Sequence, residues 1–446
     1  MKRSRLNVRL AGLLVLALIA ISCGSSGKSS SSATSTSAGS TTSTTTGAST
    51  STTVGAAPTS MDEWEALWTK QRAAIVQRIK ANKWGKSADG KTLTGPNGFT
   101  VDLSKCPASW SDTEGISETT IKLGHAIAQS GTIANTLYYG KGQETIMAYY
   151  ADKGAYKDVN GKTRKVDYIQ KDDGYDPART IPLVDEMIDS QKVAAVITTG
   201  SPNTLKTYDK LNQRCIPHFL NLTGHPAWGD PANHPWTTGL GLAYTTEAVL
   251  WGAFIDNHLA EFASGKVTVS ALVENNEFGH IYDAGFKAYL DQSTNKAKIN
   301  YVSEAVDPQA PTITDQMTTL SSKNPDFFID MVAGTFCTQA VVEAAQNGMH
   351  GKVKYMWQPN TCAGATSLSK AKVGGDGTSS QGWWIVNGGN KDIQDPAQQS
   401  DPVVKWARDM LSARGIDPSV ETNLGLGMIY GWAWTQIFQI AGQLDG

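Results

Sequence analysis

The sequence lacks the motifs by which many enzymes are recognised. It contains no Gly-x-Ser-x-Gly elbow, no phosphate-binding loop and no dinucleotide fingerprint. Its seven histidines include His218, His225 and His234, whose spacing fits neither a zinc pair on a helix nor a catalytic triad. We therefore expect no enzymatic activity, no cofactor and no metal.

Long apolar runs are missing after the first 21 residues. The chain begins with four basic residues among its first nine, continues through an apolar stretch over 10–21 and reaches Cys23. A spanning helix needs about 20 apolar residues, so residues 1–22 are predicted to be a signal peptide. Cys23 resembles the lipid-bearing cysteine of a bacterial lipobox, although Ala20 stands where that motif usually has Leu. Cleavage by ordinary signal peptidase, with an incidental Cys23, is the alternative.

Charge and bulky side chains are scarce in the segment that follows. From Gly24 to about Ser60 the chain consists almost entirely of Ser, Thr, Gly and Ala, which predicts a flexible tether over 23–60. Loss of the four basic residues of the signal peptide takes the formal net charge from −2 to −6. A net negative charge of this size disfavours nucleic-acid binding.

The rest of the chain alternates short apolar runs with helical stretches, which predicts a parallel α/β fold in two lobes. An amphipathic helix over 62–83 and an irregular strap over 85–115 precede it. The expected strands are 121–128, 165–171, 193–198, 218–221, 267–273, 300–306, 327–332, 354–357 and 383–386. The expected parts are an N-terminal extension over 61–115, lobe 1 over 116–246, lobe 2 over 247–386 and a return to lobe 1 over 387–446. The chain is expected to cross between the lobes near Tyr244 and again just after 383–386, and later helices are expected over 401–414 and 425–444.

Several short motifs follow one another in a familiar order. They are Ile121-Lys122-Leu123-Gly124 with Ser130-Gly131, Asp172-Asp173-Gly174-Tyr175-Asp176-Pro177, Ser201-x-x-Thr204, Asn276-Glu277-Phe278-Gly279, Ser367-Leu368-Ser369 and Asp392-x-x-Asp395-Pro396-Ala397. Over residues 120–446 this order resembles the type 1 periplasmic binding fold, specifically the branched-chain amino-acid (leucine/isoleucine/valine) binding family.

The resemblance implies two Rossmann-like lobes joined by hinge crossings. A small solute would be captured by cleft closure and delivered to the permease subunits of an ABC importer. The protein would be monomeric, extracytoplasmic and lipid-anchored to the bacterial cell membrane through Cys23. A ligand-sensing receptor module and a secreted hydrolase are the alternatives.

The four later cysteines, Cys106, Cys215, Cys337 and Cys362, allow three pairings, and disulfides persist in exported chains. We expect Cys106 to pair with Cys215 and Cys337 to pair with Cys362, because each pair would then lie within one lobe. We expect α-carbons within about 7 Å in each pair.

The resemblance also places candidate ligand-binding residues. Ser201 and Pro202 suit the first positions of a helix, where free backbone N–H groups favour an anion. Ser201 would hold a ligand carboxylate there, or merely cap its helix. The other candidates are Ser130, Tyr138 (or Tyr139), Thr204, Thr223, Phe278, Phe336 and Asn360. Thr223 could instead simply end a strand, and the aromatic residues could be core. The 172–177 segment is interpreted as a strand-to-helix turn, not as a metal or catalytic site.

Two further expectations come from departures from the family pattern. Branched-chain binders place an acidic side chain after the strand corresponding to 354–357, where this chain has Gln358-Pro359-Asn360. A buried ammonium without a carboxylate costs several kcal/mol, so we expect a ligand without a free ammonium unless Glu274 or Glu277 supplies the charge. The family's chain also continues into further strands, so a C-terminally truncated member with two crossings and an exposed sheet edge is expected.

Overall fold

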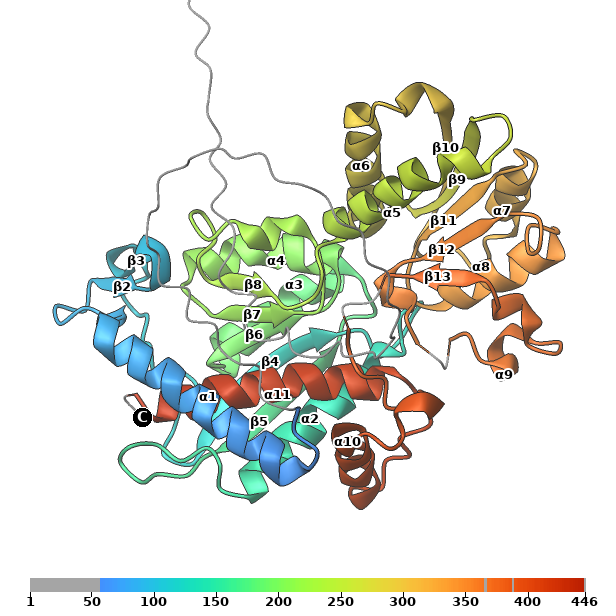
Figure 1. The fold of residues 1–446 in the computed structure, drawn as a ribbon. Coiled ribbons are helices and arrows are strands. Elements are labelled where there is room, and N and C mark those ends of the chain that lie inside the picture. The colour runs from blue at the N-terminus through green and yellow to red at the C-terminus, as the bar shows by residue number, and fades with distance from the viewer. Residues whose placement is uncertain (1–56, 365–366, 387–388, 445–446) are drawn as a thin grey trace, which may run out of the picture. The chain divides into compact units, whose positions relative to one another are not determined.

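The computed structural model describes residues 57–364, 367–386 and 389–444 (Figure 1). The predicted signal peptide, Cys23 and most of the predicted tether lie outside these residues. The unit Glu65–Gly446 holds all the sheets described below. Within the described ranges, no helix combines the length and apolar character needed to cross a bilayer.

The N-terminal extension contains helix α1 (Met61–Asn82) followed by a small antiparallel sheet of β1 (Gly85–Lys86), β2 (Thr92–Thr94) and β3 (Thr100–Asp102). The prediction of an irregular strap is therefore wrong for this segment. Asn97 and Gly98 lie between β2 and β3 with φ of 56° and 78°, and positive φ at consecutive residues suits a tight strand reversal.

A disulfide between Cys106 and Cys215, with α-carbons 5.6 Å apart, links the extension to lobe 1. Buried Val101 and Leu103 pack with Trp236 beside this bond. The second predicted pair, Cys337 with Cys362, is also present, with α-carbons 5.5 Å apart. Both predicted pairings are thus confirmed.

Lobe 1 is built on a parallel sheet in the order β5-β4-β6, continued by a parallel pair β7-β8. A bridge between Thr199 and Leu222 joins β6 to β7 at their carboxyl ends. The strands are β4 (Thr120–Ile127), β5 (Lys165–Asp172), β6 (Ala195–Thr198), β7 (His218–Asn221) and β8 (Thr237–Gly239). The helices of this lobe are α2 (Thr136–Asp152), α3 (Pro177–Asp185), α4 (Ser201–Gln213), α10 (Pro402–Ala413) and α11 (Asn423–Gly442).

Helix α11 lies directly against α2. A β-carbon added at Gly427 would lie 1.9 Å from the Tyr139 carbonyl oxygen, and one at Gly142 would lie 2.1 Å from that of Leu424. Side chains larger than hydrogen cannot fit at these positions without moving the helices apart. The last described helix therefore packs tightly against lobe 1.

Lobe 2 is a five-stranded parallel sheet in the order β10-β9-β11-β12-β13. Its strands are β9 (Val267–Glu274), β10 (Ile299–Val306), β11 (Phe327–Met331), β12 (Tyr355–Gln358) and β13 (Trp383–Ile385). Its helices are α5 (Tyr244–His258), α6 (Glu277–Gln292), α7 (Thr314–Ser321), α8 (Thr335–Gln346) and the short α9 (Lys370–Val373). Residues of α5 and α6 share one buried cluster with the sheet, and residues of α7 and α8 share another. The sheet is therefore covered on both faces.

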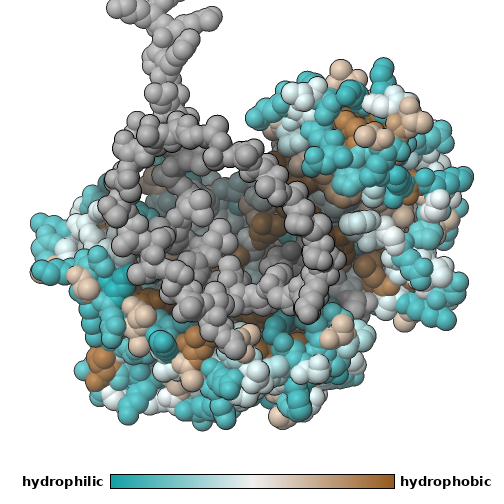
Figure 2. Space-filling view, in the orientation of Figure 1, coloured by the Kyte–Doolittle hydropathy of each residue, from teal (hydrophilic) through white to brown (hydrophobic). Residues whose placement is uncertain are grey.

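All nine predicted strands are present, with ends within two residues of the predicted positions. The two-lobed α/β architecture is confirmed. Helix α5 begins at Tyr244, the residue near which the chain was expected to cross between the lobes, and β8 was missed. Strand β13 is an outer strand of its sheet, and its Trp384 is 47% exposed. On the face of lobe 2 shown in Figure 2, hydrophilic residues predominate.

Candidate functional site

The candidate site is formed by the carboxyl ends of parallel strands in both lobes. In lobe 1 these are β6 and β7, and in lobe 2 they are β9, β11 and β12. Loops and helix N-termini converge at such ends, which is why ligands of open α/β sheets bind there.

Helix α4 begins directly after β6 and places the predicted hydroxyl of Ser201 next to that of Thr223. Its first residue is Ser201, and Gly200 with φ of 86° takes the cap position. The prediction that Ser201 caps the helix is therefore wrong by one residue. A β-carbon at Gly200 would meet the Tyr175 ring at 2.3 Å, so glycine is required there. The Ser201 hydroxyl, which does not cap the helix, lies 2.9 Å from that of Thr223, and both residues are buried.

Beneath this hydroxyl pair lies a buried polar network. Thr204 Oγ lies 2.7 Å from Thr198 Oγ and donates to the Gly200 carbonyl at 2.8 Å. His218 Nε2 lies 2.8 Å from Thr198 Oγ, and burial lowers the pKa of His218 to about 3. Since the Thr204 hydroxyl bonds Thr198 and the Gly200 carbonyl, it holds the loop that carries Ser201.

A second buried histidine, His125, joins the same loop from β4. Its Nε2 lies 2.9 Å from Thr199 Oγ, and its Nδ1 lies 2.5 Å from the Tyr168 hydroxyl. Burial lowers the pKa of His125 to about 3, so this ring is neutral at physiological pH. Sequence reasoning missed the network, because the pairing of histidines with threonines depends on strand register.

The turn after β5 brings Tyr175 to the site. Asp173 Oδ1 accepts a hydrogen bond from the Tyr175 backbone N–H at 3.0 Å, and its Oδ2 accepts one from Asn203 Nδ2 at 2.9 Å. Asp176 caps α3 by accepting from the Ala178 N–H at 2.9 Å. Ser130 Oγ donates to Asp172 at 2.8 Å. The segment is thus a strand-to-helix turn, as predicted, and it holds Tyr175 at a positive φ of 62°.

The Asn276-Glu277-Phe278-Gly279 motif forms the corresponding turn in lobe 2. Asn276 Oδ1 accepts from the backbone N–H groups of Phe278 and Gly279, which caps α6. A β-carbon at Gly279 would lie 2.0 Å from the Glu274 carbonyl oxygen, which explains the glycine. Phe278 is buried against Tyr244, with ring centroids 5.0 Å apart.

Three carboxyl groups are buried near these strand ends. Burial raises the pKa of Glu274 to about 7 and that of Glu247 to about 8, and it also raises the pKa of Asp330. Glu247 accepts from the Tyr282 hydroxyl at 2.6 Å and from the Asn360 backbone N–H at 2.8 Å. The candidate residue Asn360 is therefore held by a carboxyl group that sequence reasoning did not single out.

Three other aromatic residues lie in packed clusters. Phe336 is fully buried between the sheet of lobe 2 and α7 and α8. Tyr138 is half-buried in the cluster of α2, α10 and α11, and Tyr139 is fully buried with its ring 5.2 Å from that of Tyr430. The structure thus brings Ser201, Thr223 and the missed Tyr175 to the strand ends. It places Phe336 and Tyr139 in cores and packs Tyr138 against the edge of one.

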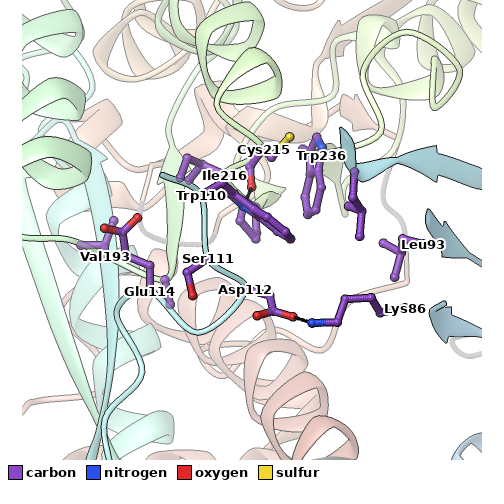
Figure 3. A pocket seen from close by; sticks show the side chains of 13 residues that line it. Lys86, Leu93, Trp110, Ser111, Asp112, Glu114, Val193, Cys215, Ile216 and Trp236 are labelled. Atoms are coloured by element: carbon purple, nitrogen blue, oxygen red, sulfur yellow. Dashed lines mark hydrogen bonds and ion pairs between the residues drawn. The ribbon is translucent and has the colours of Figure 1, made fainter. Parts of the chain in front are cut away.

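A separate cavity of about 190 Å³ lies between the extension and the amino ends of the strands of lobe 1 (Figure 3). Trp110 and Trp236 form part of its wall. Lys86 pairs with Asp112 at its edge, and Trp110 Nε1 donates to the Cys215 carbonyl at 2.9 Å. The polar groups in these two contacts bind one another. Among the described residues, no group of three or more His, Cys, Asp or Glu side chains is arranged to hold a metal.

Comparison with known proteins gives a consistent result. The sequence model of a family described as periplasmic binding protein matches residues 120–446. No curated protein matches the chain.

Three solved structures illustrate the likeness of the fold. A fatty acid ABC transporter substrate-binding protein from Thermomonospora curvata has 15% identity and a TM-score of 0.59, over 78% of this chain and 84% of that chain. A possible leucine/isoleucine/valine-binding protein from Rhodopirellula baltica SH 1 has 19% identity and a TM-score of 0.56, over 75% and 87%. A solute-binding protein of an ABC transporter from Rhodopseudomonas palustris BisB5, in complex with 3,4-dihydroxybenzoic acid, has 16% identity and a TM-score of 0.56, over 74% and 83%.

Proposed function

Because the chain belongs to the periplasmic binding protein family, we propose that it captures a small polar solute outside the cytoplasm and delivers it to an ABC importer. The solute would lie between the strand ends of the two lobes and would be enclosed when they close. Cys23 would carry the lipid that holds the protein at the membrane. No bond of the solute is changed, in keeping with a family of binding proteins.

The observation that carries this proposal is the pair of buried hydroxyls at the start of α4. Ser201 and Thr223 lie 2.9 Å apart, next to a helix N-terminus whose backbone N–H groups favour acceptor-rich or anionic groups. A carboxylate or amide oxygen could accept from both hydroxyls once their mutual hydrogen bond opens. These two residues are therefore the proposed anchor of the solute.

The carboxyl and amide side chains of lobe 2 determine which charge of solute we propose. Asn360 stands where branched-chain binders have an acidic side chain, and the nearby Glu247 has a pKa raised to about 8 by burial. A carboxyl that stays protonated at neutral pH does not offset a buried ammonium. We therefore propose a carboxylate, an amide or a related neutral compound as the solute, with leucine, isoleucine and valine bound weakly or not at all. The dihydroxybenzoic acid bound by the Rhodopseudomonas palustris protein is an example of such a carboxylate.

A thermal-shift screen tests the proposal, followed by titration calorimetry of any hit. The panel contains leucine, valine, short amides, urea, aliphatic carboxylates and hydroxybenzoates. A solute at 100 times its Kd adds about 2.7 kcal/mol to the free energy of unfolding. Micromolar or tighter binding of leucine would contradict the proposed solute class.

Matched variants of α4 locate the site. Ser201→Ala should weaken binding of the hit about tenfold, because a hydrogen bond to a charged group contributes about 1.5–3 kcal/mol. Thr207→Val is the control: Thr207 is buried on the same helix, and its hydroxyl bonds only the backbone carbonyls of Asn203 and Thr204. Equal affinity of Ser201→Ala and the native protein would remove Ser201 from the site.

A further inference from the structure

Two segments of lobe 2 contact lobe 1 directly. Asn276 Nδ2 lies 3.4 Å from the Tyr175 hydroxyl, and the Thr335 backbone N–H donates to the Thr132 carbonyl at 3.0 Å. At Gly334 an added β-carbon would lie 2.2 Å from the same Thr132 oxygen, and φ there is 63°. Only glycine allows this approach of the two backbones. The contacts thus join groups of the two lobes directly.

One buried side chain holds both of these segments. Glu274 ends β9 and is 2% exposed. Its Oε1 accepts from Asn276 Nδ2 at 2.6 Å, and its Oε2 accepts from the Ala333 backbone N–H at 3.1 Å. Asn276 is the residue that meets Tyr175, and Ala333 directly precedes Gly334 and Thr335. Both lobe-contacting segments are thus anchored to the same carboxyl group.

The anchored groups have little freedom of their own. Asn276 uses its Oδ1 to cap α6, so its Nδ2 has a fixed direction, shared between Glu274 and Tyr175. Ala333 packs with Ile133 and Tyr175 of lobe 1. Without the carboxyl of Glu274, the Ala333 N–H loses its acceptor, and the loop that presents Gly334 to Thr132 loses its attachment to β9.

We propose that Glu274 is a positioning residue for closure, which presets two segments of lobe 2 to dock on lobe 1 before any solute binds. This inference rests on the proposed capture by closure. Its consequence is that the closed form is populated without solute, and that the observed affinity scales with that population. The groups that face Glu274 are Tyr175 of lobe 1, Tyr244 of α5 and Asp330 of β11. Burial raises the pKa of Glu274 to about 7.

The test measures the distance between the lobes in the solute-free protein. Nitroxide labels on Lys206→Cys of α4 and Ala288→Cys of α6, both exposed positions, report the distance distribution by pulsed electron paramagnetic resonance. Cys23→Ser in the same chain leaves only the two engineered thiols to react. Glu274→Ala should lower the ratio of short to long distances about tenfold, because the two segments must then be ordered at docking, at a cost comparable to one or two net hydrogen bonds. Glu274→Gln, which keeps one acceptor oxygen, should fall between alanine and the native chain.

Asp330→Asn is the matched control. Asp330 is a buried carboxyl on the neighbouring strand, and the partner of its Oδ2 is Gln358 Nε2 at 3.4 Å, within lobe 2. This variant should leave the distance distribution unchanged. Gly334→Ala, which leaves Glu274 intact but places a methyl group against Thr132, should open the lobes as Glu274→Ala does.

The outcomes separate this inference from the proposed function. An unchanged distribution in Glu274→Ala, or an equal shift in Asp330→Asn, overturns the positioning role. Neither result depends on a solute, so the inference can fail while a solute from the screen still closes the native protein. If no solute in the screen shortens the distances in the native protein, the proposed function fails, whatever the variants show.

Discussion

Replacing Glu247 with Gln should change how stability depends on pH. In the folded protein, burial raises the pKa of Glu247 to about 8 from the ordinary value of 4.5. Between these two values the folded state holds a proton that the unfolded state has lost. The free energy of unfolding therefore falls as pH rises through this window, by about 1.4 kcal/mol per pH unit for one group. Below pH 4.5 both states are protonated and above pH 8 neither is, so the change is confined to the window.

Glutamine does not titrate and keeps the size of the protonated side chain. Its oxygen can still accept from the Asn360 N–H, and its amide can still meet the Tyr282 hydroxyl. At pH 4.5 the two proteins should differ little. At pH 8 the Glu247→Gln variant should be more stable by roughly 3–5 kcal/mol, as an order of magnitude.

Urea unfolding at pH 4.5, 6 and 8, followed by tryptophan fluorescence, measures the difference. Glu304→Gln, on the outer strand β10, serves as the control for the replacement of a glutamate by glutamine elsewhere in the same lobe. A difference between Glu247→Gln and the native protein that stays constant across this range would show that Glu247 is ionised in the folded state. The account of the buried carboxyl would then be wrong.

Two further predictions concern a buried histidine of lobe 1 and the two disulfides. Burial lowers the pKa of His218 from 6.5 to about 3. Between these two values the unfolded state binds a proton that the folded state does not bind. The free energy of unfolding therefore falls as pH falls below 6.5. His218→Gln should flatten the acid side of the stability curve by about 1.4 kcal/mol per pH unit, measured by urea unfolding at pH 4, 5 and 6, and an unchanged slope would refute this. The Cys106–Cys215 bond closes a segment with a sequence separation of 109 residues, so the double serine variant should lose about 5 kcal/mol. Replacing Cys337 and Cys362, separated by 25 residues, should cost less, about 3.5 kcal/mol, and the reverse order in urea unfolding would contradict the loop-length reasoning.

Nine strands of the two lobes were predictable from the sequence as short runs rich in apolar residues between turn residues, whereas β8, Thr237–Gly239, has no apolar residue and was missed. The sheet of the N-terminal extension was missed although Asn97-Gly98 is a strong hairpin signal. Its strands are only two to three residues long and carry no run of apolar residues. The Asn97-Gly98 turn alone did not predict a hairpin, because no alternation of apolar and polar residues flanks it and the neighbouring residues are rich in Gly, Pro and Asp.

The candidate site was predictable only where a residue type has a fixed place next to a strand. Ser201 follows β6 and Thr223 follows β7, and their contact follows from the pairing of these strand ends. Glu247 could not be placed, because its partner Asn360 lies 113 residues further along the chain. Burial of a carboxyl depends on such distant partners, and no local pattern records it.

The close packing of α11 on α2 has a consequence for the order in which the protein can be built. Asn423 Nδ2 bonds the Asn135 carbonyl, and Tyr156 lies 3.0 Å from Thr435, across sequence separations of 288 and 279 residues. During synthesis, α2 leaves the ribosome long before the helix that covers it, and the whole of lobe 2 is made in the interval. Lobe 2 contains its own helices and strands and can fold in that time, since domains generally fold as units. The first lobe to be synthesised is thus the last to acquire its complete core, and until α11 arrives the glycine-lined face of α2 stays open to other partners.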